Sequence, residues 1–485
     1  MTNNKRNHKS FIFEEIIMSI KSAYFFIILA ILNLKTSGVY VLIAIALFSI
    51  IKSILKYINI KYYYDDSELK YFTGIINKKQ IEIPFDKINT IDINLNIVDR
   101  IFNVCTLKID TGAVKELGEE IKIKLVKEEA YKIRSVINDL IDKKDLRDKD
   151  KKEDVNKSKF KETITFKEIF LYSLSKSKLL WAIGGFFIIS DLVFNIEDTL
   201  NITITDTIIE SVNIDEIYAL GMAKIVGIGI IIFIILYIFI SFLFIIFELI
   251  RLYNFTLIDD ENDIKIKYGL LTIKEYSIPR NKIYAVRYKQ NLLQQIFKIF
   301  QIEIVTIGYG DEKNEQAILY PVANKVFINT TLKEILPDFN FEDNINCSPK
   351  NVLSKFIIKR SLILILFLIL PLHFIIPKTL LILKIVIFTF LIIFNIILGY
   401  INYRNTSLGI NKDLLRCSNG SLQKITTLIK QEYLQSVEIK ENPFQRRKSV
   451  CDFKLDIYSN KIGNIVILSN MEKILINHID ENLIL

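Results

Sequence analysis

A repeat at constant spacing constrains the fold more than any other feature of this sequence. Its landmarks in the first copy are Gly74, Pro84, Ile88 and Asn96. The same residue types recur 195 residues later, at Gly269, Pro279, Ile283 and Asn291. A weaker third copy follows 151 residues further on, at Gly420, Lys430, Leu434 and Asn442. Because each copy follows very apolar segments, we predict one unit used three times, a membrane hairpin followed by a small β-rich domain.

The composition supports alternating apolar and polar blocks. The 485 residues are 51% hydrophobic and 24% charged, with a formal net charge of +9. Basic residues that flank membrane helices explain this charge better than a nucleic-acid partner does. We therefore expect no nucleic-acid partner. The four cysteines are isolated and only three histidines occur. We therefore expect no metal or other cofactor, and reduced, buried thiols.

Six apolar segments approach the length of about 20 residues that a membrane span needs. They form three pairs: Ile16–Leu34 with Val39–Leu55, Leu179–Ile196 with Leu220–Ile250, and Leu362–Ile376 with Leu380–Ile401. A short, partly apolar and partly basic segment precedes each pair. We expect these three segments to lie at the inner membrane surface as helices: Phe13–Ser22, Phe166–Ser175 and Pro349–Phe356.

The flanking charges predict the orientation. Lysine and arginine residues stand at the ends that join the spans to the β-rich regions, whereas the outer connection 197–216 carries acidic residues and no Lys or Arg. Because basic residues favour the cytoplasmic side, we expect a multi-pass protein of the bacterial inner membrane. Both termini and all three β-rich domains would be cytoplasmic.

After each hairpin the hydrophobic period changes to two, which is typical of antiparallel strands with one buried face. Ile264 and Ile266, for example, alternate with charged neighbours. The landmark glycines predict hairpin turns, the prolines predict strand ends, and the asparagines predict caps or turns after a strand. Each unit ends in a helical pattern, at Lys127–Ile141, Val322–Leu336 and Met471–Ile479.

These signals divide the chain into seven segments. The three hairpins with their surface helices are 10–57, 163–251 and 348–402, and the three β-rich domains are 58–141, 252–340 and 403–485. Residues 142–162 are densely charged and are predicted to be a solvated linker.

The repeat resembles the bacterial membrane-flanked-domain family. The resembling stretches are Tyr71–Leu95, Tyr268–Leu292 and Asn419–Asn442, and with the hairpins they cover nearly the whole chain. The third copy departs from the pattern at Lys430 and Leu434. The resemblance implies three pleckstrin-homology-like (PH-like) domains on six spans, each a bent seven-stranded sheet capped by a C-terminal helix. It implies neither an active site nor phosphoinositide binding.

The search for chemistry leaves two kinds of candidate. Ionisable residues inside membrane segments are functional suspects, here Asp191 and His373. Snorkelling or pairing at an interface is the favoured alternative for both, and it is favoured more strongly for Glu248 and Arg251. The other kind is basic clusters that could face anionic lipid headgroups. They are Lys78, Lys79, Arg280, Lys282, Arg446, Arg447 and Lys448. A solvated basic face is the competing interpretation.

The function that we expect is that of a non-enzymatic membrane scaffold or assembly protein, serving a process such as envelope protection. Repeated β domains offer exposed strand edges for pairing. Self-association is expected, or binding of a shorter, single-unit relative, which the resemblance suggests, besides contact with the lipid bilayer. The alternative is a transport or lipid-handling protein that uses the six-helix bundle.

Overall fold

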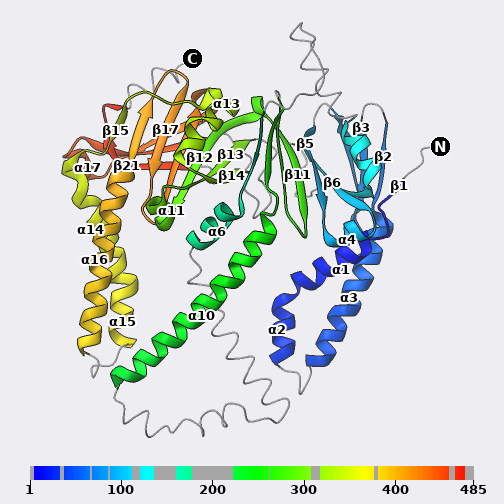
Figure 1. Ribbon diagram of the computed structural model, residues 1–485, viewed down its shortest axis with the longest axis horizontal. Helices are drawn as coiled ribbons and strands as arrows, with labels where there is room; N and C mark the ends of the chain where they lie inside the picture. Colours follow the sequence, from blue (N-terminus) through cyan, green and yellow to red (C-terminus); the bar gives the residue numbers. More distant parts are fainter. Residues whose placement is uncertain are drawn as a thin grey trace. The chain divides into compact units, whose positions relative to one another are not determined.

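The computed structural model of the chain describes eleven segments (Figure 1). They are residues 5–32, 38–65, 68–85, 88–111, 121–135, 160–176, 222–260, 263–306, 317–375, 381–457 and 465–475. The chain divides into two compact units. The first holds Met1–Lys157, Glu162–Thr256 and Lys265–Ser277, and the second holds Ser158–Lys161, Leu257–Ile264 and Ile278–Leu485.

The strands fall into three sets of seven among the described residues. The first set is β1 (Lys5–Arg6), β2 (Lys61–Tyr64), β3 (Glu68–Thr73), β4 (Lys79–Pro84), β5 (Ile88–Leu95), β6 (Val104–Thr111) and β7 (Ile121–Val126). The second is β8 (Phe160–Thr163), β9 (Thr256–Asp260), β10 (Asp263–Tyr268), β11 (Ile273–Pro279), β12 (Ile283–Asn291), β13 (Phe300–Thr306) and β14 (Ile318–Ala323). The third is β15 (Ile345–Cys347), β16 (Ser407–Ile410), β17 (Leu414–Asn419), β18 (Gln423–Lys430), β19 (Leu434–Lys440), β20 (Val450–Ile457) and β21 (Ile465–Glu472).

These strands do not form one bent sheet per repeat, as the resemblance implied. Each repeat splits into a first group of four strands and a second group of three, and the groups assemble into four sheets. The sheet orders are β1-β2-β3-β4, then β7-β6-β5-β11-β10-β9-β8, then β14-β13-β12-β18-β17-β16-β15, and finally β19-β20-β21. The second group of one repeat therefore continues into the first group of the next. Strand hydrogen bonds favour this fusion because it satisfies backbone groups that two separate edges would expose.

The first strand of each repeat comes before its membrane hairpin and pairs with the strand after it. Lys5 lies opposite Tyr62, and Cys347 lies opposite Ser407. The apolar segments are thus inserted between two paired strands of the β domain, and the domain begins earlier than predicted. In the second repeat this strand, β8, begins at Phe160, inside the segment that we expected to be linker.

The helices in and before the apolar segments are α1 (Phe11–Ser22), α2 (Tyr24–Leu32), α3 (Gly38–Asn59), α6 (Phe166–Ser175), α10 (Met222–Arg251), α14 (Leu353–Leu364), α15 (Leu370–Ile375) and α16 (Leu381–Asn405). Three described helices are long and apolar enough to cross a membrane, over Gly38–Asn59, Phe233–Arg251 and Lys384–Asn405. The partner segment of the first hairpin is broken between α1 and α2. That of the third contains a π-helical turn, Ile365–Ile369, between α14 and α15. Residues 179–196 lie outside the described part, so six spans stay a prediction.

The shorter helices are α4 (Ile97–Ile101), α11 (Leu292–Phe297), α12 (Lys325–Asn329), α13 (Thr331–Ile335) and α17 (Pro443–Arg446). Short 3₁₀ turns cover Arg280–Lys282, Pro337–Phe339, Lys350–Val352 and Gln431–Tyr433. The predicted helix Val322–Leu336 is instead the end of β14 followed by α12 and α13. Asn324 caps α12, and Thr330 separates the two helices. Met471, predicted to begin a helix, still belongs to β21.

The repeat landmarks have the local roles that the sequence indicated. Gly74, Gly269 and Gly420 follow a strand with φ of 102°, 113° and 104°. Pro84 and Pro279 close β4 and β11. Asn96, Asn291 and Asn442 are N-caps of α4, α11 and α17, each in a capping box with the residue three positions on, Asp99, Gln294 or Gln445. The alternation is confirmed too, since Ile264 and Ile266 are both buried.

Candidate functional site

The contacts that join successive repeats form the first candidate site, and we call the two strand pairings the seams. At the first seam β5 pairs with β11, with Leu95 opposite Ile273 and Ile93 opposite Glu275. At the second seam β12 pairs with β18 over seven positions, from Ala285 opposite Ile429 to Asn291 opposite Gln423. Both pairings are antiparallel. Each seam adds the first strand group of one repeat to the second group of the repeat before it.

The two seams have the same register. Gln290 corresponds to Leu95 in the repeat, and Lys424 corresponds to Ile273. Gln290 lies opposite Lys424, as Leu95 lies opposite Ile273. A one-residue slip would turn every side chain of a strand to the other face, so an identical register means that both seams join the same faces.

A side chain beside each strand pair repeats the same contact. Arg100, in α4, donates to the carbonyl oxygen of Leu270 at 2.8 Å. The corresponding Gln295, in α11, donates to the carbonyl oxygen of Ser421 at 3.0 Å. In both seams the accepting residue follows the landmark glycine of the next repeat. The helix that the landmark asparagine caps therefore holds the next repeat's turn.

The turns at the seams are also bound to the ends of membrane helices. The backbone N–H of Gly269 donates to the Tyr253 carbonyl at 2.8 Å, just beyond α10. The N–H of Gly420 donates to Asn402 Oδ1 in α16 at 3.1 Å. Arg360, in α14, donates to Ser421 Oγ at 2.6 Å. The glycine turn thus connects the end of a long apolar helix to the β-sheet.

Glu275 is the polar centre of the first seam. Its carboxylate accepts from Arg134 at 2.9 Å and from the Tyr131 hydroxyl at 3.2 Å, both on the helix over residues 127–135 of the first repeat. Lys267 lies 3.4 Å away. Burial alone would raise the pKa of Glu275, but Arg134, Lys267 and Tyr131 together lower it.

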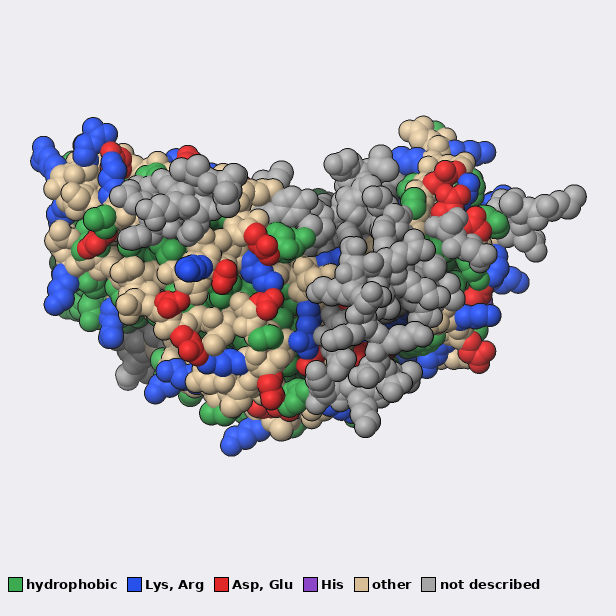
Figure 2. Space-filling model, turned by 90° about the horizontal axis from the view of Figure 1, so that it is seen from above, with side chains coloured by type: hydrophobic (Ala, Val, Ile, Leu, Met, Phe, Trp, Pro, Cys, Tyr) green, Lys and Arg blue, Asp and Glu red, His purple; other side chains and the backbone are tan. Residues whose placement is uncertain are grey.

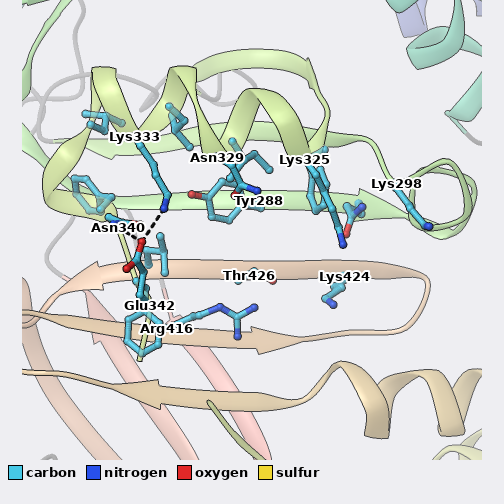
Figure 3. Close-up of a pocket in the computed structure, with 18 of the residues that line it drawn as sticks. Tyr288, Lys298, Lys325, Asn329, Lys333, Asn340, Glu342, Arg416, Lys424 and Thr426 are labelled. Atoms are coloured by element: carbon cyan, nitrogen blue, oxygen red, sulfur yellow. Dashed lines mark hydrogen bonds and ion pairs between the residues drawn. The ribbon is translucent and has the colours of Figure 1, made fainter. Parts of the chain in front are cut away.

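The second seam carries a basic cavity of about 660 Å³ (Figure 3). The second repeat lines it with β12, β13, α12 and α13, and the third lines it with β17 and β18. Five of the lining residues are basic: Lys298, Lys325, Lys333, Arg416 and Lys424. Its acidic residue, Glu342, is paired with Lys333 at 2.8 Å.

The cavity places cations near one another in a partly buried setting. Burial lowers the pKa of Arg416. It also lowers the pKa of Lys424, and the nearby charges of Arg416, Lys325 and Arg404 lower it further. Burial and like charge both disfavour the charged form. An anion in the cavity would relieve this repulsion.

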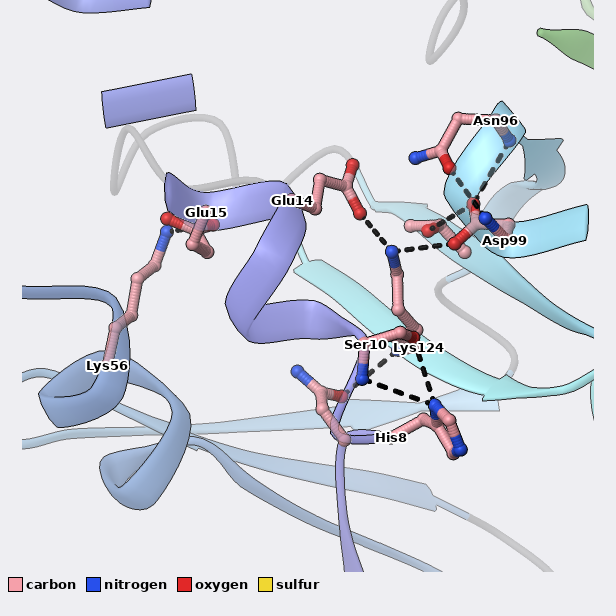
Figure 4. A network of polar contacts seen from close by, with 10 residues as sticks. His8, Ser10, Glu14, Glu15, Lys56, Asn96, Asp99 and Lys124 are labelled. Carbon is pink, nitrogen blue, oxygen red and sulfur yellow. Dashed lines mark hydrogen bonds and ion pairs between the residues drawn. The ribbon is translucent and has the colours of Figure 1, made fainter. Parts of the chain in front are cut away.

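A second polar network ties α1 to the β domain of the first repeat (Figure 4). Lys124, in β7, is fully buried and contacts Asp99 at 2.6 Å and also Glu14 of α1. Asp99 is the residue that forms the capping box with Asn96. Burial raises the pKa of Asp99, opposed by its contact with Lys124. Neither Glu14 nor Lys124 recurs in the other repeats, so this network was not visible from the sequence.

The predicted basic clusters lie at three unrelated places. Lys78 and Lys79 are at the start of β4, Arg280 and Lys282 are in the turn after β11, and Arg446–Lys448 are at α17. Arg280 pairs with Asp259, Arg446 lies 3.2 Å from Glu441, and Lys448 donates to the Asn351 carbonyl. Figure 2 shows acidic and basic side chains mixed over the visible face. The clusters therefore do not form one repeated surface, and lipid contact stays a prediction.

The intramembrane candidates gain little support. Asp191 lies outside the described residues. The His373 side chain is exposed, and its carbonyl oxygen accepts from Lys384 at 2.6 Å. Glu248 is paired with Lys176 at 2.7 Å and with Arg251 at 3.1 Å, as the interface interpretation predicted. The described residues hold no cluster of His, Cys, Asp or Glu that could bind a metal ion.

The cysteines separate into two classes. Cys105, Cys417 and Cys451 are buried, and burial raises their pKa values to about 11, 12 and 11. Cys347 is exposed in β15, which corrects the expectation that all four thiols are buried. A three-residue edge strand has too little cover to bury its side chains.

Comparisons with known proteins agree with the repeat. The sequence model of the bacterial PH domain matches three times, over residues 23–141, 192–334 and 362–480. The chain is similar to the UPF0699 transmembrane protein YdbT of Bacillus subtilis (strain 168). The two are 24% identical over 440 residues, which cover 88% of this chain and 84% of that protein. No solved structure matches the chain.

Proposed function

The chain belongs to the bacterial PH domain family, and from this premise we propose that it is a non-enzymatic scaffold of the bacterial cell membrane. The observation that carries the proposal is the repeated seam. Two strand pairings in one register join the domains by backbone hydrogen bonds, which suits a fixed display of domains more than independent modules. The hydrogen bonds from Gly269 and Gly420 to the membrane-helix ends support the same proposal.

The full proposal is a multi-pass protein with both termini and all three PH-like domains in the cytoplasm. Its role would be to hold partner proteins at the membrane surface. Envelope protection is a process that such a scaffold would serve. The transport alternative is favoured less, because the described intramembrane groups Lys384 and Glu248 already have protein partners.

Affinity purification of the tagged chain from its native membranes tests the scaffold proposal. After mild cross-linking we expect proteins in stoichiometric amounts with the chain. Ile425→Pro, in β18 where both neighbouring strands pair with it, should lose them, because a proline in a central strand removes a ladder hydrogen bond. Ile425→Val is the matched control and should retain them. If neither the unmodified chain nor the Ile425→Val control purifies with other proteins, the scaffold proposal is refuted.

We further propose that the basic cavity binds a small phosphate-bearing anion. The supporting observation is the five basic residues that line it against one acidic residue, Glu342, already paired. Cationic side chains with several hydrogen-bond donors suit phosphate oxygens.

Calorimetric titration of the purified full chain with inorganic phosphate, at low salt, tests this second proposal. We expect binding that weakens as salt increases. The double variant Arg416→Gln and Lys424→Gln should abolish it, whereas Lys412→Gln, an exposed residue that does not line the cavity, should not. If the double variant binds phosphate with the same affinity as Lys412→Gln, the anion binds elsewhere in the protein.

A further inference from the structure

Two strand groups, β1–β4 of the first repeat and β19–β21 of the third, have no seam partner among the described strands. Every seam pairs the last strand of a first group with the first strand of a second group: β11 with β5, and β18 with β12. Among the described strands, β4 of the first repeat has only β3 beside it, and β19 of the third repeat has only β20. These are the strands that correspond to β11 and β18, and to β5 and β12.

The side chains on these strands are less covered than their counterparts at the seams. Val286 and Leu428, which lie opposite each other in the second seam, are 0% and 4% exposed. The corresponding positions in these two strand groups are Val437, half-buried, and Glu82, exposed. Among the described residues, both strand groups thus have fewer covering contacts than the strands at the seams.

We propose that β19 of one copy pairs with β4 of a second copy, so that the chain assembles head to tail. This proposal rests on the scaffold function proposed above and names its partner. The occupant is a second copy because each chain supplies both halves of the same seam, and the contact continues an interface that the chain already makes twice within itself. A heterologous contact of this kind extends into a row or closes into a ring.

The repeat specifies the register of the new seam. In the new seam, β19 takes the place of β12, and β4 of the second copy takes the place of β18. With the register of the second seam, Ser436 then lies opposite Ile83, and Ile439 lies opposite Gln80. At the two seams, Arg100 donates to the Leu270 carbonyl and Gln295 donates to the Ser421 carbonyl. The corresponding residues at the new seam are Arg446 of one copy and Ile75 of the other. Arg446 would donate to the carbonyl oxygen of Ile75. Arg446 would therefore hold the turn of the neighbouring copy. This gives an arginine of the predicted basic clusters a structural role.

The charges at the new seam are mostly compatible. Glu441 would lie opposite Lys78, which is attractive, although Glu441 already lies 3.2 Å from Arg446 and 3.2 Å from Lys473 in its own chain. Lys440 would lie opposite Lys79, which is repulsive, but Glu438 lies 2.9 Å from Lys440 and offsets part of its charge. Directly opposite like charges weaken a strand pair, so this one position offers a way to strengthen the assembly.

Disulfide cross-linking between two differently tagged full-length chains tests the register. Both carry Cys347→Ser, which removes the exposed native thiol. One also carries Gln80→Cys and the other Ile439→Cys. Directly opposite residues on antiparallel strands have a separation that a disulfide can bridge. We expect a mixed dimer on oxidation in membranes that contain both chains.

The control pairs Gln80→Cys with Lys440→Cys. A shift of one residue moves the thiol to the other face of the strand, so this pair should not cross-link, although losing Lys440 removes a repulsion. Lys79→Glu, added to the first pair, should raise the yield about threefold by replacing a like pair with an opposite one. Equal yields from the 80–439 and 80–440 pairs, or none from 80–439 in membranes, would overturn the proposal.

The two proposals fail in different ways. If the 80–439 pair does not cross-link while other proteins purify with the chain, the head-to-tail contact is wrong and the scaffold stands. If the 80–439 pair cross-links but no other protein purifies with the chain, the head-to-tail contact stands and the scaffold for partner proteins is refuted. If the chain has no protein partners and the 80–439 pair does not cross-link, both proposals are refuted.

Discussion

Arg134 donates a hydrogen bond of 2.9 Å to Glu275, and this contact links two successive repeats through residues that are 141 positions apart in the sequence. Arg134 is only 7% exposed. A buried charge that loses its partner is costly, so the first seam depends on Glu275 remaining ionised.

The first prediction concerns the pH dependence of this seam. The folded pKa of Glu275 is lowered from its ordinary value of 4.5, so its stabilising effect is present above that value and is lost as the pH falls through the lowered pKa. Glu275→Gln should destabilise the seam at pH 7 and should lose this acid dependence. Thermal unfolding of both full chains between pH 7 and pH 3 measures the difference. A difference that does not change with pH would show that the Glu275 charge is unimportant.

The second prediction concerns the landmark glycines. A Cβ atom at Gly74 would lie 1.9 Å from the carbonyl oxygen of Asn77, and its φ of 102° is unfavourable for other residues. Gly74→Val should destabilise the β3–β4 hairpin by about 1–3 kcal/mol. Hydrogen exchange of β3 and β4 in the full chain measures this, because excising a domain would cut a sheet at a seam. Ile76→Val, at the exposed tip of the same turn, is the control and should change little.

The third prediction concerns topology, and Cys347 is a natural reporter for it. We expect an impermeant maleimide to leave Cys347 unlabelled in intact cells and to label it after permeabilisation. Asn201→Cys, in the acidic connection that is predicted to be external, should label in intact cells. Labelling of Cys347 from outside would reverse the orientation inferred from the basic flanks.

The fourth prediction concerns the basic clusters. If Lys78 and Lys79 face lipid, the full chain in neutral nanodiscs should bind anionic vesicles, and salt should weaken the binding. Neutralising both lysines should reduce it, whereas Lys412→Gln should not. If the full chain does not bind anionic vesicles even at low salt, the interpretation of a solvated basic face is preferred.

Much of the local structure followed from the residues. The glycine turns, the strand ends at Pro84 and Pro279 and the three asparagine caps depend on backbone conformation and on contacts within a few residues. The helix after β14 was predicted less well, because Asn324 and Thr330 divide it into two. The basic cavity was missed because its cations come from two repeats, with Lys325 on a helix and Arg416 on a distant strand.

The sequence by itself determined the repeat, the presence of apolar helices besides β-rich domains, and the turn and cap at each landmark. Periodicity and glycine, proline and asparagine chemistry act over short distances, and a repeat shows itself by spacing alone. Only the tertiary structure decided which strands share a sheet. Leu95 and Ile273 carry no mark of their pairing, because a backbone ladder accepts almost any side chain. The partner of an edge strand is decided by the fold that brings another edge beside it.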